Sequence, residues 1–452
     1  MNKTKLTFIF LILFFLCQNN ISRADQPAPQ QIAIVQQSLS LNEAIHFALK
    51  NNLIMRLARE RINEAKGKST SGNSDLLPHI GIEGYQMKVQ RFNLQTMGLP
   101  GLLGPFDAFD ARLQLEQRIF DLSAFSKSKA ENLAVEIARY GEDLAHRQVM
   151  TQAIMAYLNV LKNAESLKTI DENISVAEKF VKLSEHQRAV GMATQVDEVR
   201  AETRLAQEKA AREKILFNLQ SADFNLKRVT GIALDCPLRL TDTLLFFVEP
   251  AYPVQKTLDE AFNNRVEITI AEQRVEYKKL KLQEAKSLHL PKISLVGDYG
   301  TSGVRINRDK HEVGEFGIKA SFPIFEGGAI EGQIMQETSI KKQEEMTRDD
   351  VSIQIEEDVR LSLQILQTSL QAVYANDIAQ KLSSRELEYT KNQYINGLED
   401  NLKVDAAQSD LAQTKENYIT ALAQYHTGRV NYYSAIGKLE QFSLNQPEVN
   451  HE

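Results

Sequence analysis

The stretch that decides the fold is FDARLQLEQRIF, residues 109–120. Its odd-numbered positions carry mainly apolar side chains: Phe109, Ala111, Leu113, Leu115 and Ile119. Its even-numbered positions carry polar or charged ones: Asp110, Arg112, Gln114, Glu116 and Arg118. Because successive side chains of a β-strand point to opposite faces, this alternation predicts a strand with one apolar and one polar face.

Three further stretches have a similar character, at residues 80–92, 292–303 and 315–325. The first of them changes parity after Ile82, so we expect a bulge or a later start there. Each stretch is long enough to cross a bilayer at a tilt, which takes about 9–11 residues. Two interpretations remain open: strands that span a membrane, or a half-buried sheet of a soluble protein.

Four strands restrict the membrane interpretation. In hydrocarbon every backbone N–H and C=O must be paired, so an open sheet with two free edges is excluded. Small barrels begin near about eight strands, so one copy cannot close a barrel. Two copies would give about eight strands, whose interior is filled by side chains, whereas three copies leave room for a channel. A membrane-spanning form is therefore predicted to be a trimer.

The chain also repeats itself once. Four matches recur in the same order: LNEA at 41–44 with LDEA at 258–261, LP at 77–78 with LP at 290–291, IFD at 119–121 with IFE at 324–326, and residues 187–191 with 393–397. Each repeat is predicted to contain a helix, two strands and a very long helical stretch, so the fold class is mainly α with a small β part.

The long helical stretches lack proline between Pro105 and Pro237 and between Pro323 and Pro447. Proline is excluded from helix interiors because it lacks an amide donor and clashes with the preceding turn. Apolar side chains there are spaced alternately by four and three residues, which is typical of a coiled coil. Gly191 and Gly397 are the expected turns at which each stretch folds back as a hairpin.

These boundaries define the expected domain organisation. A basic start, an apolar run and Ser22-Arg23-Ala24 predict a secretory signal peptide, residues 1–24, that is cleaved after about Ala24. An alternative use of Cys17 is lipid attachment, for which the preceding Leu16 is larger than usual. The other predicted segments are a linker at 25–40, a first repeat at 41–231, an equatorial segment at 232–255, a second repeat at 256–440 and a disordered tail at 441–452.

Composition argues against several functional classes. The formal net charge of −6 offers no basic face for nucleic acid. Two cysteines rule out a disulfide framework or a Cys-rich metal site, and the eight histidines show no ligand spacing. We find no pairing of a nucleophile with a base, so we expect no enzyme activity, no cofactor and no metal.

Together these motifs resemble the TolC-like outer-membrane efflux protein family. The resemblance covers about residues 38–440 and includes FPIFEGG at 322–328, where Pro323, Gly327 and Gly328 mark a strand-to-helix transition, and QYING at 393–397. It implies a homotrimer in the cell outer membrane, in contact with outer-membrane lipid. A twelve-stranded barrel would continue into a periplasmic helical tube that serves as an exit duct. The implied partners are a periplasmic adaptor (membrane fusion) protein and an inner-membrane transporter of an efflux or type I secretion system.

The resemblance also implies a gate at the helical tip. Carried over by position, a latching tyrosine falls on Tyr394 and its aspartate partner on Asp197. The family's latching arginine falls on Glu399, and its two constricting aspartates fall on Lys403 and Ala406.

These departures leave the chemistry of the tip open. Glu399, Asp400 and Asp405 are candidates for a substitute acidic ring, Lys403 for a basic one, and the whole stretch for a solvated hairpin end. An alternative for the whole protein is a periplasmic coiled-coil adaptor or scaffold without a transmembrane barrel.

Overall fold

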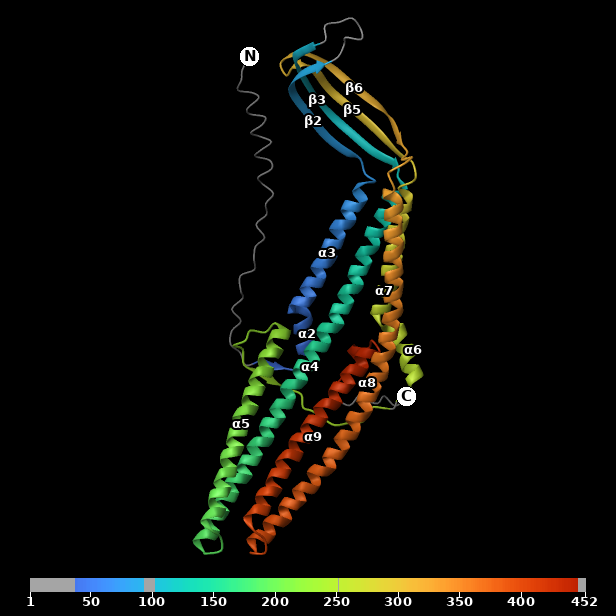
Figure 1. Cartoon of the computed structure of the whole chain (residues 1–452). Helices are drawn as coiled ribbons and strands as arrows, with labels where there is room; N and C mark the ends of the chain where they lie inside the picture. The colour runs from blue at the N-terminus through green and yellow to red at the C-terminus, as the bar shows by residue number, and fades with distance from the viewer. Residues whose placement is uncertain (1–36, 93–101, 251, 446–452) are drawn as a thin grey trace.

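The computed structural model describes residues 37–92, 102–250 and 252–445. A sheet lies at one end of the molecule, and long helices lead away from it to two hairpin turns at the other end (Figure 1). The predicted signal peptide with Cys17, most of the linker, and residues 446–452 lie outside the described residues.

The two repeats have the same order of elements. The first contains α2 (Leu41–Asn51), α3 (Leu53–Ser74), β2 (His79–Phe92), β3 (Leu102–Phe120), α4 (Leu122–Ala189) and α5 (Gln195–Thr230). The second contains α6 (Val254–Asn264), α7 (Val266–Ser287), β5 (Lys292–Arg305), β6 (Arg308–Ser321), α8 (Ala329–Ile395) and α9 (Asn401–Ala435). Corresponding helices have matching lengths, such as 22 residues in α3 and α7 and 68 and 67 residues in α4 and α8. The internal repeat is confirmed.

Helix lengths explain how the helices stack. The 68 residues of α4 extend for about 100 Å, whereas the 36 residues of α5 return over only about 54 Å. The shorter helix α3 packs against the rest of α4, and α7 does the same for α8 (Figure 1). Within the described part of the chain, no helix combines the length and the apolarity needed to cross a membrane.

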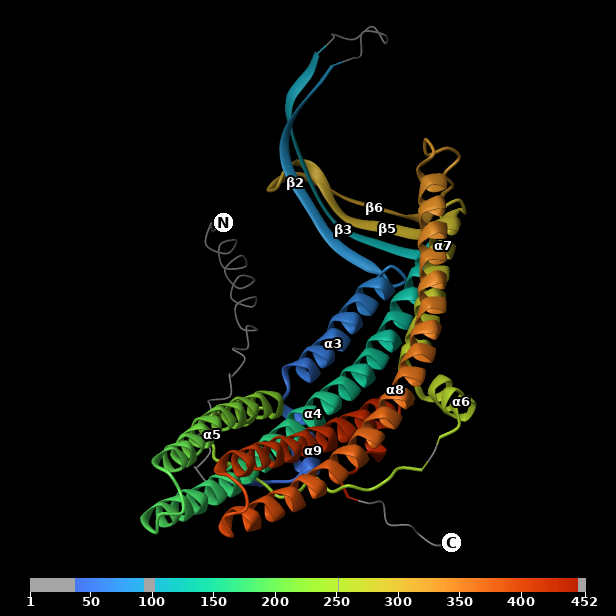
Figure 2. The same ribbon diagram turned by 60° about the horizontal axis from the view of Figure 1, so that its bottom comes forward.

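The sheet joins the two repeats. Its strand order is β2-β3-β5-β6, and all neighbouring pairs are antiparallel. The β3–β5 pair crosses from one repeat to the other, with Leu113 opposite Tyr299. The strands curve away to one side of the helices (Figure 2), and β2 and β6 form the two edges of the sheet.

Two strand predictions need correction. Strand β6 covers residues 308–321 rather than 315–325. Its first part, residues 308–314, is mostly polar and pairs with β5, and Pro323, which has no N–H to donate, lies just beyond its end. In β2 the register shifts between Val89 and Arg91, not after Ile82. Up to Ile82 the even-numbered residues of β2 are apolar, whereas Gln86 and Lys88 at later even-numbered positions are polar.

The ends of the described chain are more ordered than predicted. In the linker, β1 (Gln37–Leu39) pairs in parallel with β4 (Leu238–Leu240) of the equatorial segment. The predicted disordered tail is wrong for residues 441–445, because Phe442 and Leu444 are buried in the main core. Two apolar side chains at this spacing suffice to hold so short a segment against the helices.

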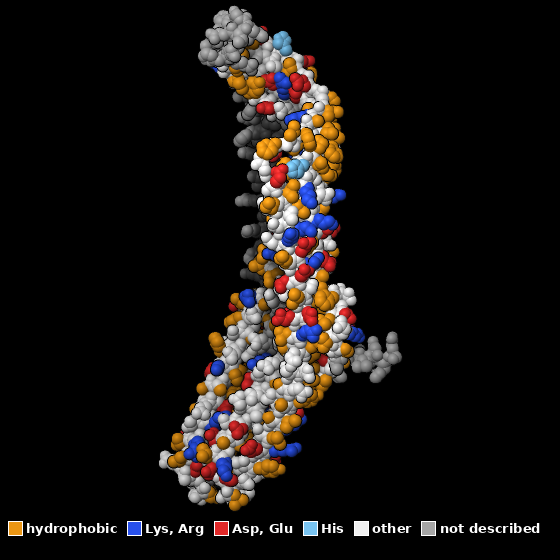
Figure 3. All heavy atoms as spheres, turned by 45° about the vertical axis from the view of Figure 1, so that its right-hand side comes forward, with side chains coloured by type: hydrophobic (Ala, Val, Ile, Leu, Met, Phe, Trp, Pro, Cys, Tyr) orange, Lys and Arg blue, Asp and Glu red, His pale blue; other side chains and the backbone are white. Residues whose placement is uncertain are grey.

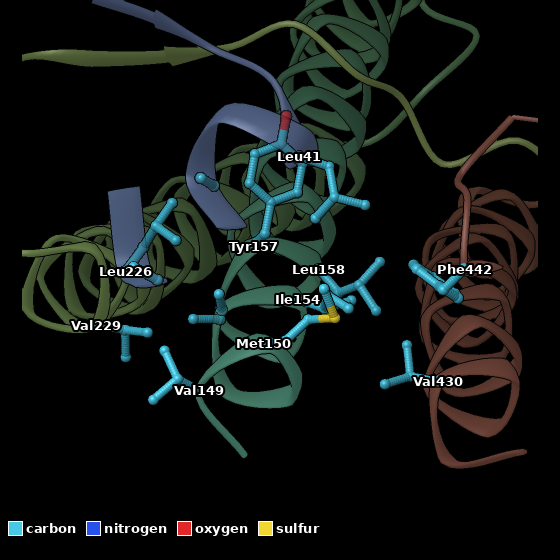
Figure 4. Packing of buried hydrophobic residues seen from close by; sticks show 14 of the residues in the cluster. Leu41, Val149, Met150, Ile154, Tyr157, Leu158, Leu226, Val229, Val430 and Phe442 are labelled. Atoms are coloured by element: carbon cyan, nitrogen blue, oxygen red, sulfur yellow. The ribbon is translucent and has the colours of Figure 1, made fainter. Parts of the chain in front are cut away.

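That core lies where α2, α4, α5 and α9 meet. Figure 4 shows Ile154, Tyr157 and Leu158 of α4 near Leu226 of α5 and Val430 of α9. The core thus ties both hairpins and the equatorial segment together midway along the molecule.

Candidate functional site at the helical tip and the sheet

Both hairpins turn through a glycine in the left-handed conformation. Gly191 has a φ of 78° and Gly397 a φ of 70°, values that strain any residue with a Cβ. In the first turn the Met192 N–H donates to the Gln187 carbonyl at 2.8 Å, and the second turn repeats this bond. This hydrogen bond is typical of a Schellman motif, which ends a helix sharply.

The two aspartates near these turns cap helices. The Asp197 carboxylate accepts from the Thr194 N–H and hydroxyl, both at 2.8 Å, at the start of α5. The Asp400 carboxylate accepts from the Lys403 N–H at 3.1 Å at the start of α9. Both therefore stabilise the first turn of a returning helix, where unpaired N–H groups and the helix dipole favour an anion.

Tyr394 does not form the predicted latch with Asp197. Its ring packs against Phe180, with ring centroids 5.5 Å apart, in a small apolar cluster that includes Val404. Its buried hydroxyl has no hydrogen-bond partner among the described residues. Apolar packing at the Tyr394 ring, rather than a polar latch, holds the tyrosine in place.

A different residue links the two hairpins at Asp197. The buried Asn401 side chain, at the first position of α9, donates from Nδ2 to the Asp197 backbone carbonyl at 2.8 Å. The sequence does not predict this bond, because every residue type has a backbone carbonyl that can accept it.

The charged side chains proposed for a ring at the tip lie on the second hairpin. Lys403 donates to the Glu399 carboxylate at 2.7 Å, and this hydrogen bond raises the pKa of Lys403. Asp405 is half-buried on α9 and makes no ion pair with any described residue. Lys403 and Glu399 thus form an ion pair, and the acidic side chains of Asp400 and Asp405 stand outside it.

The sheet has two chemically distinct faces. On one, Arg112 of β3 bridges Asp110 and Asp298 at 2.9 Å each, which ties the two repeats together. On the other, large apolar side chains are exposed near the helical end: Ile80, Ile82, Leu113, Tyr299, Phe316 and Ile318. This apolar band would be unfavourable in water.

The strand-to-helix transitions differ between the repeats. In the first, Asp121 follows β3 directly and caps α4 through the N–H groups of Ser123 and Ala124. In the second, a loop through Pro323 separates β6 from α8. Gly327 and Gly328 both have positive φ, and no side chain caps α8.

A buried cluster of charges joins the equatorial segment to α9. Arg429 donates to the Glu249 carboxylate at 2.6–2.7 Å, and their side chains are only 1% and 4% exposed. The guanidinium lies 4.1 Å from the centre of the Phe247 ring. We call Glu249, His426 and Arg429 the equatorial clasp. Sequence reasoning missed it because Glu249 lies 180 residues before Arg429 in the chain.

His426 completes the clasp in its neutral form. Its Nε2 lies 3.1 Å from the Leu245 carbonyl, an acceptor, so this nitrogen carries the proton. Its Nδ1 lies 3.2 Å from Arg429 and accepts a hydrogen bond from the guanidinium. Burial, with the nearby positive charge of Arg429, lowers the pKa of His426 to about 4.

The chain is similar to known outer-membrane proteins in sequence. It is 23% identical over 406 residues to outer membrane protein TolC of Escherichia coli, covering 86% of this chain and 78% of TolC. It is 21% identical over 433 residues to the alkaline protease secretion protein AprF of Pseudomonas aeruginosa, covering 91% and 87% of the two chains.

The fold is similar to solved outer-membrane channels. The CmeC channel of Campylobacter jejuni superimposes with a TM-score of 0.78 at 17% identity, covering 89% of this chain and 87% of CmeC. The MtrE channel of Neisseria gonorrhoeae gives a TM-score of 0.73 at 18% identity, covering 90% and 91%. The family model for outer membrane efflux proteins matches residues 44–232 and 257–438, which correspond to the two repeats. The chain therefore belongs to the outer membrane efflux protein family.

Proposed function

We propose that three copies of this chain form a passive exit duct. Three four-stranded sheets close into one twelve-stranded barrel across the outer membrane, and the helices continue it as a tube into the periplasm. Residues 41–231 and 256–440 act as the two repeats of the wall, and residues 232–255 as an equatorial segment around it. A passive duct needs no catalytic residues.

The observation that carries this proposal is the sheet. Its edges, β2 and β6, lack partners within the described chain, and its apolar band is exposed, with Ile82 at 85%. Lipid accommodates an apolar face only when every strand edge is paired. Pairing β6 of one copy with β2 of the next satisfies both requirements, and it places the Arg112 ion pairs inside a water-filled lumen.

The tip supports contact with partner proteins. Both turns expose large apolar side chains next to the left-handed glycines: Val190, Met192, Leu398 and Leu402. Exposed apolar clusters of this kind favour protein contacts. A periplasmic adaptor that joins the duct to an inner-membrane transporter fits this surface. AprF is named for protease secretion, which makes export by such an assembly the proposed role here.

Membrane fractionation tests the assembly. Outer membranes that contain the protein, extracted in detergent and run unheated on a denaturing gel, are expected to give a trimer that heating converts to the monomer. The purified trimer should conduct ions across planar bilayers. A monomer in the soluble periplasmic fraction would contradict the proposal and favour an adaptor or scaffold instead.

We expect Asn401→Ala to increase the open time of the channel. The substitution removes the hydrogen bond from Asn401 to the Asp197 carbonyl, one of several hydrogen bonds between the two hairpins, which costs about 1 kcal/mol per copy. Weaker contact between the hairpins favours the open tip. Single-channel recording in planar bilayers measures the effect.

Tyr394→Phe is the matched control for the tip. It removes a hydroxyl that has no partner and is too deeply buried for a neighbouring copy to reach, so conductance should not change. A conductance raised by Tyr394→Phe and unaffected by Asn401→Ala would restore the latch assigned to Tyr394 from the sequence.

A further inference from the structure

The helices lose their charged side chains at the level of the equatorial clasp. Three stretches contain no Asp, Glu, Lys or Arg: residues 148–161 of α4, 361–376 of α8 and 417–428 of α9. These four residue types make up 25% of the whole chain. The stretches are neighbours in space, because α9 packs against both α4 and α8, and a Cβ on Gly428 would lie 3.2 Å from the Ser369 hydroxyl of α8. On the face in Figure 3, charged side chains are dense on the helices below the sheet and sparser farther down, before the tip.

On α9 a stripe of uncharged polar side chains is accessible at this level. Six amide or hydroxyl side chains, each exposed or half-buried, are spaced alternately by three and four residues: Asn417, Thr420, Gln424, Thr427, Asn431 and Ser434. That spacing places them on one face of the helix. Arg429, the charged residue within this range, points into the clasp, and Thr427 and Asn431 lie about 200° round the helix from it. The stripe therefore faces away from the equatorial segment.

Helix α4 carries a matching stripe. Tyr157 faces the equatorial segment, where its hydroxyl donates to the Asp242 carboxylate at 2.7 Å. Gln148, Gln152 and Asn159 are exposed and, at about 100° per residue, lie on the opposite face of the helix. We call these three side chains, together with the six of α9, the neutral belt.

The position of the equatorial segment indicates which face of these helices meets the lumen. This segment covers one face of α4 through Asp242 and one face of α9 through Glu249, and the neutral belt lies on the other face of both. In the proposed duct, on which this inference rests, the helical wall has one face toward the lumen and one toward the periplasm. The equatorial segment adds a second layer of chain to the wall, and three such layers on the inner face would obstruct the passage. An outer equatorial segment leaves the neutral belt on the inner face.

We propose that the neutral belt lines the lumen at the equatorial level and lets cargo of either charge pass. Amide and hydroxyl groups both donate and accept hydrogen bonds, so they contact cations, anions and neutral groups without a preference for one sign of charge. Rings of like charges, by contrast, select ions in a channel. Charged side chains lie at other levels, on the polar face of the sheet, as Arg112 and Asp298 do, and at the tip. Selection by charge is therefore left to the two ends of the duct.

Thiol labelling tests which face of the helices meets the lumen. Gln424→Cys places a thiol in the neutral belt, and Val248→Cys places one on the equatorial segment, where Val248 is 52% exposed next to Glu249. The unmodified full-length protein, with its buried Cys236, is the blank. Each is labelled in planar bilayers with a maleimide that carries a polyethylene glycol chain of several kilodaltons. Labelling of Gln424→Cys should lower the conductance several-fold, whereas labelling of Val248→Cys should leave it unchanged.

Reversal potentials test the neutrality of the belt. Gln424→Glu should raise the ratio of cation to anion permeability several-fold at low salt, and Gln424→Lys should lower it. Each substitution puts a ring of like charges into the lumen under conditions where screening is weak. Val248→Glu adds the same charge on the equatorial segment and should leave the ratio unchanged.

The outcomes separate the belt from the duct. If the polymer does not lower the conductance through Gln424→Cys, the belt does not line the lumen, and the inference fails while the duct stands. Permeability ratios that change in neither Gln424→Glu nor Gln424→Lys overturn it as well. If the unmodified protein does not conduct, the proposed duct itself is overturned.

Discussion

Replacing Arg429 with methionine should lower the free energy of unfolding by about 3–5 kcal/mol per copy. The substitution keeps most of the side-chain volume and removes the charge that balances Glu249, whose side chain is only 4% exposed. A buried carboxylate without its ion pair is desolvated with no compensating charge, which is unfavourable. Guanidinium unfolding of the detergent-solubilised protein, followed by circular dichroism, measures the loss.

Two further variants separate the clasp from charge removal in general. Arg360→Met removes a partner of Glu356 from an exposed pair on α8 and should cost no more than about 0.5 kcal/mol. Adding Glu249→Leu to Arg429→Met should restore much of the stability, because no unpaired charge then remains. If Arg360→Met costs as much as Arg429→Met, the clasp is not a special contributor to stability.

The clasp should also make stability depend on pH. The pKa of His426 falls from 6.5 to about 4 on folding, so the unfolded chain binds this proton first as pH is lowered. The stability held by neutral His426 is complete above pH 6.5, is lost between 6.5 and about 4, and amounts to about 3 kcal/mol. His426→Gln, which keeps a donor for the Leu245 carbonyl, should flatten this part of the profile.

Phe316→Arg should prevent the protein from accumulating in the outer membrane. Phe316 lies within the apolar band of β6 and is 76% exposed, so in the duct it faces lipid. An arginine on the lipid face near the middle of the bilayer costs about 2–4 kcal/mol. The trimer carries this cost in every copy. The measurement is the yield of heat-modifiable trimer in the outer-membrane fraction.

The neighbouring residue provides the control. Gly317 points to the polar face, and a side chain added there meets no atom within 4 Å. Gly317→Arg should therefore leave the yield of trimer close to that of the unmodified protein, although it adds the same charge to the same strand. Equal losses for both variants would contradict the assignment of the two faces of the sheet.

Features that depend on near neighbours in the chain were accessible from the sequence. The alternation in residues 109–120 follows from the geometry of a strand, and the positive φ of Gly191 and Gly397 follows from helix termination. The internal repeat and the family resemblance rest on several such local patterns in a fixed order.

Local sequence patterns gave wrong predictions for the start of β6 and for the C-terminal tail. Polar residues at the start of β6 lack alternation, yet they pair with β5 because backbone hydrogen bonds do not require apolar side chains. In the tail, Phe442 and Leu444 are too few to predict order by themselves, but a core formed by other segments buries them.

Taken alone, the sequence determined the repeated helix–strand–strand–helix plan and the two-faced strands, because periodicity is imposed by the geometry of the backbone itself. Only the tertiary structure decided that Asn401 rather than Tyr394 bonds to Asp197, and that Arg429 meets Glu249. These pairs join residues about 180–200 positions apart. Which polar group meets which across such a separation depends on how the helices pack, and no local pattern of residues encodes it.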